Sequence, residues 1–90
     1  MADLKRRIAQ SALNARAEGT TALPKLSAAE LEAVAAGRAS PVIMSRFENA
    51  WQAAKRAAWL GGADWAMHEN LNDAQLQELF ERAEQRSSGR

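Results

Sequence analysis

The chain has 90 residues, of which 47% are hydrophobic and 26% charged, with a formal net charge of +1 and no cysteine. This length supports one small core, which excludes two independent domains. The lack of cysteine excludes disulfides and thiolate metal sites, and no stretch is apolar enough for a signal peptide or membrane span. We therefore expect a cytoplasmic protein that does not enter a membrane.

Residue usage favours helix throughout the chain. Alanine occurs 21 times and leucine 9 times, whereas valine, isoleucine and threonine together occur 6 times. Alanine and leucine are strong helix formers, while strands depend on β-branched and aromatic residues. The composition predicts an all-α fold, a compact bundle of four to five helices over residues 1–85, followed by a disordered tail over 86–90.

The first predicted helix spans residues 3–18 and is amphipathic. Its apolar side chains recur with helical spacing on one face, at Leu4, Ile8, Ala12 and Ala15. Residues 19–25 contain two adjacent threonines and a proline, which disfavour helix. We expect a connector there.

The second predicted helix lies between Ser27 and Gly37. Ser27 and Glu30 have the spacing of a capping box, and Gly37 stands where a left-handed residue ends a helix. Ser40 and Pro41 then form another start signal, because serine caps a helix and proline suits its first position.

The third predicted helix, residues 41–60, is the longest, at about 30 Å. Whether it is one continuous helix or two is left open. Its inner face carries Met44, Phe47, Trp51, Ala54 and Ala58. A short helical turn over residues 64–70 and a last helix after the Asn72–Gln75 cap complete the bundle. The last helix has an inner face of Leu76, Leu79, Phe80 and Ala83.

Side chains for catalysis are scarce. The chain has no cysteine or tyrosine and a single histidine, His68, so a hydrolytic triad or a histidine-cluster metal site cannot be assembled. The nearest approach to a metal-ligand set is Asp64 with His68, near Glu69 and Asp73, and the simpler interpretation is a surface histidine among acids. We expect no enzyme activity, no cofactor and no metal.

Charge is distributed unevenly along the chain. Residues 1–56 have a net charge of +4, and residues 57–90 have a net charge of −3. A basic first part favours contact with phosphate and an acidic last part favours contact with protein. The alternative is an ordinary charged surface whose net charge varies along the chain without a functional role.

Residues 30–37 and 40–49 resemble the helix-turn-helix of lambda-repressor-like DNA-binding proteins. Glu30 to Gly37 is similar to the first helix and its turn glycine, and Ser40 to Asn49 is similar to the recognition helix. The resemblance implies that Met44 and Phe47 hold this helix against the first one while its first turns enter the major groove. The residues that would then face DNA are Ser40, Val42, Ile43, Ser45, Arg46 and Asn49.

The chain has more large aromatic residues than its inner faces need. Trp51 fits the inner face of the third predicted helix, Trp59 lies about 80° away from it around the helix, and Trp65 falls in an irregular stretch. Either Trp59 and Trp65 pack on the last helix, or they form a dimer or partner interface, since tryptophan dominates many interfaces. The predicted interface comprises Trp59, Trp65, Leu79 and Phe80.

Together these features predict a small non-enzymatic regulator. The first hypothesis is a homodimeric transcriptional regulator that binds double-stranded DNA with the helix starting at Pro41. The alternative is a protein-interaction module, an antagonist or adaptor of another macromolecular complex, that uses an exposed Trp and Phe patch.

Overall fold

A computed structural model describes residues 2–68 and 70–88, and these residues form helices and no strand. The helices are α1 (Ala2–Ala17), α2 (Ala28–Ala35), α3 (Pro41–Leu60), the short 3₁₀ helix η1 (Asp64–Met67) and α4 (Asp73–Ser88). The all-α prediction is confirmed. No described helix combines the length and the apolar character that crossing a membrane requires.

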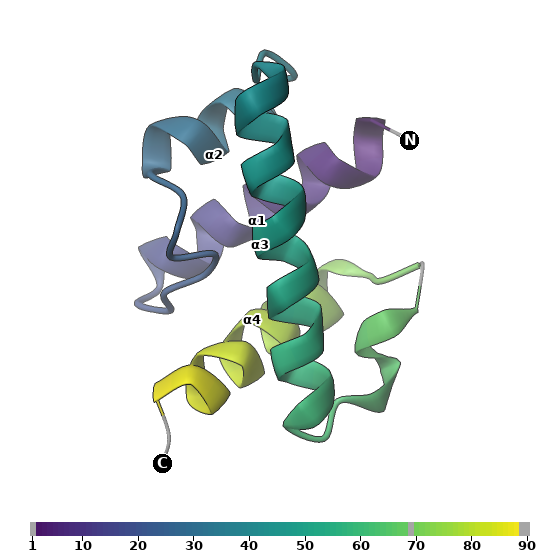
Figure 1. Cartoon of the computed structure of the whole chain (residues 1–90). Helices are drawn as coiled ribbons and strands as arrows, with labels where there is room; N and C mark the ends of the chain where they lie inside the picture. Colours follow the sequence, from purple (N-terminus) through teal and green to yellow (C-terminus); the bar gives the residue numbers. More distant parts are fainter. Residues whose placement is uncertain (1, 69, 89–90) are drawn as a thin grey trace.

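The long helix α3 forms the front layer of the molecule. It runs across α1 and α4, which lie behind it and pack against each other (Figure 1). Helix α2 packs mainly on α1, beside the upper half of α3, and η1 turns back to pack beside the lower half. One face of α3 is thus covered by the rest of the fold, and no other described helix lies over its front face.

The predicted capping signals act as expected at the starts of α2 and α3. The backbone N–H of Glu30 donates to Ser27 Oγ at 3.1 Å, and the N–H of Ser27 donates to Glu30 Oε1 at 2.9 Å, which completes the capping box. Gly37 has a φ of 76°, so a glycine relieves the strain of the turn after α2. Ser40 caps α3, with Pro41 in its first turn.

Residues 41–60 form one continuous helix, which answers the question that the sequence left open. The helix ends at a turn in which Gly62 has a φ of 106°. A reciprocal pair of hydrogen bonds between Asn72 and Gln75, at 2.8 and 2.9 Å, starts α4 as predicted. Helix α4 then continues to Ser88, past the predicted domain end at residue 85, because no glycine or proline interrupts residues 86–88. Residues 89 and 90 of the predicted tail lie outside the described residues.

The core lies between the four α-helices, and most of the predicted inner faces point into it. Ile8, Ala12 and Ala15 of α1 are buried, and Leu4 is half-buried. The Trp51 ring of α3 meets the Phe80 ring of α4 edge to face, with 6.0 Å between ring centroids. Further buried positions on α3 and α4 are Phe47, Ala58, Leu76 and Leu79.

Candidate nucleic-acid interface

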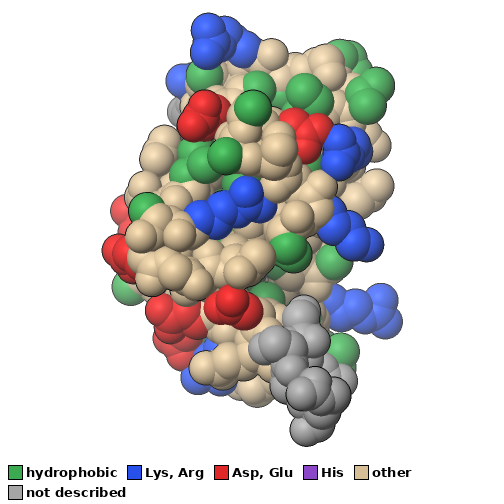
Figure 2. Space-filling view, turned by 90° about the vertical axis from the view of Figure 1, so that its left-hand side faces the viewer, with side chains coloured by type: hydrophobic (Ala, Val, Ile, Leu, Met, Phe, Trp, Pro, Cys, Tyr) green, Lys and Arg blue, Asp and Glu red, His purple; other side chains and the backbone are tan. Residues whose placement is uncertain are grey.

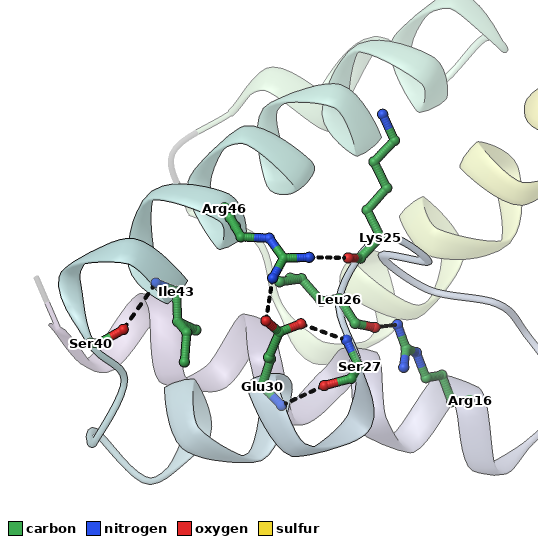
Figure 3. A network of polar contacts seen from close by, with 8 residues as sticks. All are labelled: Arg16, Lys25, Leu26, Ser27, Glu30, Ser40, Ile43 and Arg46. Carbon is green, nitrogen blue, oxygen red and sulfur yellow. Dashed lines mark hydrogen bonds and ion pairs between the residues drawn. The ribbon is translucent and has the colours of Figure 1, made fainter.

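Three of the six residues predicted to face DNA are engaged within the fold. The Ser40 hydroxyl accepts a hydrogen bond from the backbone N–H of Ile43 at 3.2 Å, so it serves as the cap of α3. The Ile43 side chain is half-buried, packs against the core and points toward α2 (Figure 3). Ser40 and Ile43 therefore stabilise the start of α3, and the assignment of these two side chains to DNA contact is not supported.

Arg46, the third of these residues, binds partners in two other segments. One guanidinium nitrogen forms an ion pair with Glu30 of α2, and another donates to the Lys25 carbonyl at 2.8 Å (Figure 3). Glu30 also completes the capping box, so its carboxylate is held in place from both sides. Arg46 thus joins α3 to α2 and to the preceding connector at the surface of the molecule.

Arg16 of α1 stabilises the connector before α2, whose Lys25 carbonyl accepts the hydrogen bond from Arg46. The Arg16 guanidinium donates to the carbonyl oxygens of Ala22, Leu23 and Leu26 at 2.8, 2.5 and 2.6 Å. Leu23 is buried and has a φ of 49°, a left-handed conformation that is strained for a residue with a β-carbon. The Arg16 hydrogen bonds stabilise this strained turn, and so they fix the Lys25 carbonyl where Arg46 reaches it.

The other three predicted residues, Val42, Ser45 and Asn49, lie on the exposed front face of α3. At about 100° per residue, two further exposed residues, Gln52 and Arg56, continue the same stripe, and all five fall within about 80° of the helix circumference. None of their side chains has a hydrogen bond or ion pair with another residue that the structure describes. We call Val42, Ser45, Asn49, Gln52 and Arg56 the front stripe.

The sequence analysis missed Gln52 and Arg56 because the resemblance covers only residues 30–49. The signal that could have found them is the repeat of exposed polar residues at 45, 49, 52 and 56, spaced by four, three and four. α2 packs less extensively on α3 than on α1, and α3 continues unbroken past Asn49. The helix-turn-helix resemblance stays a prediction.

The front face of α3 carries no unpaired acidic side chain. Glu48, the acidic residue within α3, lies on the flank of the helix and is paired with Lys5 of α1. On the same flank, Lys55 Nζ lies 5.5 Å from the centroid of the Trp51 ring. In Figure 2, Lys and Arg side chains follow one another down the right-hand edge, on the side where α3 runs, with acid beside them near the top of that edge, and further Asp and Glu side chains lie toward the left and below. The front stripe itself carries one cation, Arg56, and no acidic side chain.

A shallow apolar groove of about 660 Å³ separates the front stripe from α4. Four alanines of α3 contribute to its floor, residues 21–25 line one side, and Glu84 of α4 stands at the far side. Glu84 accepts a hydrogen bond from the backbone N–H of Thr21 at 3.1 Å. Asn49 of the front stripe also lines this groove.

The predicted partner interface is only partly at the surface. Leu79 and Phe80 are buried, with exposures of 0% and 1%, so their prediction as interface residues is wrong: the inner face of α4 packs on α3. Trp65 is half-buried and packs against the core. Trp59 is 47% exposed. Leu60 and Met67, at 51% and 46%, are the other large exposed apolar residues near the end of α3.

Within residues 2–68 and 70–88, no three acidic or histidine side chains converge on a point where they could hold a metal ion. His68 is exposed, and Glu69, which belongs to the candidate ligand set, lies outside the described residues.

The chain matches no protein-family model, and no curated protein or solved structure is significantly similar to it. What the front face of α3 binds must be argued from its own geometry and chemistry.

Proposed function

We propose that this protein is a non-enzymatic DNA-binding regulator that lays α3 in the major groove of double-stranded DNA. The observation that carries the proposal is the front stripe, whose exposed side chains lie on the open face of α3 and have no hydrogen bond or ion pair with another described residue. The major groove is about 12 Å wide and admits one α-helix. Asparagine, glutamine and arginine are the side chains that hydrogen-bond best to base edges, and valine can contact the thymine methyl group.

Basic residues beside the front stripe supply contacts to phosphate in this proposal. The Lys25 side chain is exposed and has no partner among the described residues, although its carbonyl holds Arg46. Arg38 is exposed in the turn before α3, and Lys55 lies on the opposite flank from Lys25. Each such contact would release counterions. In a plot of the logarithm of affinity against the logarithm of salt concentration, each contact would make the slope more negative by about 0.9.

The test is the binding of the purified protein to pooled random duplex DNA, followed by sequencing of the enriched fraction and a salt titration. We expect an enriched motif in which Arg56→Gln loses the preference at one base position. Arg82→Gln in α4 is the matched control, because it removes the same charge from an arginine paired with Glu78 on another helix. Absence of any enriched motif, with residual binding lost by about 0.2 M salt, would contradict the proposal.

A second candidate function is docking on another protein, including a second copy of this chain, through the apolar end of α3. Four large apolar residues are exposed in the described chain, and three of them lie near this end: Trp59, Leu60 and Met67. Exposed tryptophan is often an interface anchor. Under this candidate, Trp59→Ala lowers the self-association measured by sedimentation equilibrium, or the affinity for an identified partner, while DNA selection yields no motif.

A further inference from the structure

The length of the front stripe determines how α3 would have to lie on DNA. Asn49, Gln52 and Arg56 occupy three successive turns of an unbroken helix, so the side chains available for base contact extend well beyond its first turn. A helix that enters the groove end-on brings only its first turns to the bases. To use Asn49 and Arg56 together, α3 must lie along the groove.

The spacing within the front stripe matches the spacing of base pairs. Asn49 and Arg56 are seven residues apart, which corresponds to about 10.5 Å along the helix axis at about 1.5 Å per residue. Three base-pair steps of about 3.4 Å cover nearly the same distance. A helix that lies along the groove would therefore place the two side chains opposite bases three base pairs apart.

Side-chain chemistry then indicates which bases these are. A carboxamide can make two hydrogen bonds to the N6 and N7 edge of adenine, and a guanidinium can make two to O6 and N7 of guanine. Both side chains are exposed, and neither has a partner among the described residues, so no intramolecular bond has to break before they pair with a base. Arg46 differs, because its donors already hold Glu30 and the Lys25 carbonyl.

We propose that Asn49 and Arg56 are the specificity-determining residues of α3 and that they select an adenine and a guanine three base pairs apart. This inference rests on the proposed function. Gln52 faces the base pairs between them. Arg46 is a positioning residue, which orients α3 against α2 and the connector and does not read a base.

The experiment compares the motifs enriched by the wild-type chain, Asn49→Ala, Arg56→Ala and Arg46→Ala from one random duplex pool. We expect the wild-type motif to contain adenine and guanine three base pairs apart. Asn49→Ala should lose the preference at the adenine position alone, and Arg56→Ala at the guanine position alone. Replacing either base in the best duplex should weaken wild-type binding about tenfold, and should weaken the matching variant by less than about twofold. Arg46→Ala should keep both preferences.

The outcomes separate this inference from the function on which it rests. If the wild-type chain enriches no motif, both fail. A motif whose preferences change in neither variant, or change at positions with another spacing, leaves DNA binding standing and overturns the assignment of the two residues. If Arg56→Ala keeps the motif and lowers the salt slope by about one, Arg56 contacts phosphate and the assignment is likewise overturned. Circular dichroism checks that each variant is folded.

Discussion

The two halves of α3 use their polar side chains in different ways. In the first half, the Ser40 hydroxyl caps the helix and the Arg46 guanidinium holds Glu30 and the Lys25 carbonyl. In the second half, Gln52 and Arg56 are exposed and have no partner among the described residues. Arg46 and Arg56 have the same chemistry, but Arg46 already donates to Glu30 and to the Lys25 carbonyl, whereas Arg56 has no hydrogen-bond partner among the described residues. Residue type alone therefore does not identify a binding residue.

The largest expected effect comes from the covered face of α3. Phe47→Ala removes a fully buried ring and leaves a cavity, which should lower the free energy of unfolding by about 3–5 kcal/mol. Leu60→Ala, in the exposed second half, should change it by less than about 0.5 kcal/mol. Urea unfolding followed by tryptophan fluorescence measures both. Similar losses in the two variants would show that the end of α3 is buried in solution, for example against a second copy.

The connector gives the next largest effect. Arg16→Met removes three hydrogen bonds to carbonyl groups of residues 22–26 and should lower the free energy of unfolding by about 2 kcal/mol. Lys25→Met is the matched control, because the Lys25 side chain is exposed and has no partner among the described residues, and it should change stability little. An equal loss in both variants would mean that Arg16 does not hold the turn that contains Leu23.

The capping serine is compared with a serine of the front stripe. Ser40→Ala removes the acceptor for the N–H of Ile43 and should cost about 1 kcal/mol. Ser45→Ala changes an exposed mid-helix residue to the best helix former, so it should be neutral or slightly stabilising. Thermal melts of the two variants test this difference. A destabilised Ser45→Ala would reveal a structural role for the front stripe.

The smallest effect on stability, and the sharpest contrast in function, comes from the two arginines. Arg46→Gln should lower the free energy of unfolding by less than about 1 kcal/mol, since its ion pair with Glu30 is partly exposed, and Arg56→Gln should leave it unchanged. Their effects on DNA should be reversed, with base preference lost in Arg56→Gln and retained in Arg46→Gln. Calorimetry together with binding to the selected duplex measures both quantities. If Arg46→Gln alone loses the base preference, the residues that select bases lie in the first half of α3 and the assignment to Arg56 is wrong.

Much of the fold followed from local signals. The capping pairs Ser27–Glu30 and Asn72–Gln75 and the glycine at 37 act over one turn of helix, so their meaning does not depend on distant residues. The inner faces of α1 and α3 followed from helical periodicity in the same way. Leu79 and Phe80 had a helical period too, but periodicity does not say whether an apolar face packs within the chain or between chains.

The candidate site was less predictable, for two reasons. The partners of Arg46 lie 16 and 21 residues earlier in the chain, so only the packing of α2 and the connector against α3 shows that its donors are occupied. In addition, the helix-turn-helix resemblance covers only residues 30–49. It could not include Gln52 and Arg56, which the uninterrupted helix places on the same face as Asn49.

By itself the sequence determined which segments are helical, where α2, α3 and α4 begin, and which face of each is apolar, because caps, glycines and periodicity act over three or four residues. The tertiary structure alone decided that α3 lies in front of α1 and α4, that Arg46 pairs with Glu30 and the Lys25 carbonyl, and that Arg56 remains free of partners among the described residues. Those features depend on contacts between segments far apart in the chain, which only the packing of the whole core brings together.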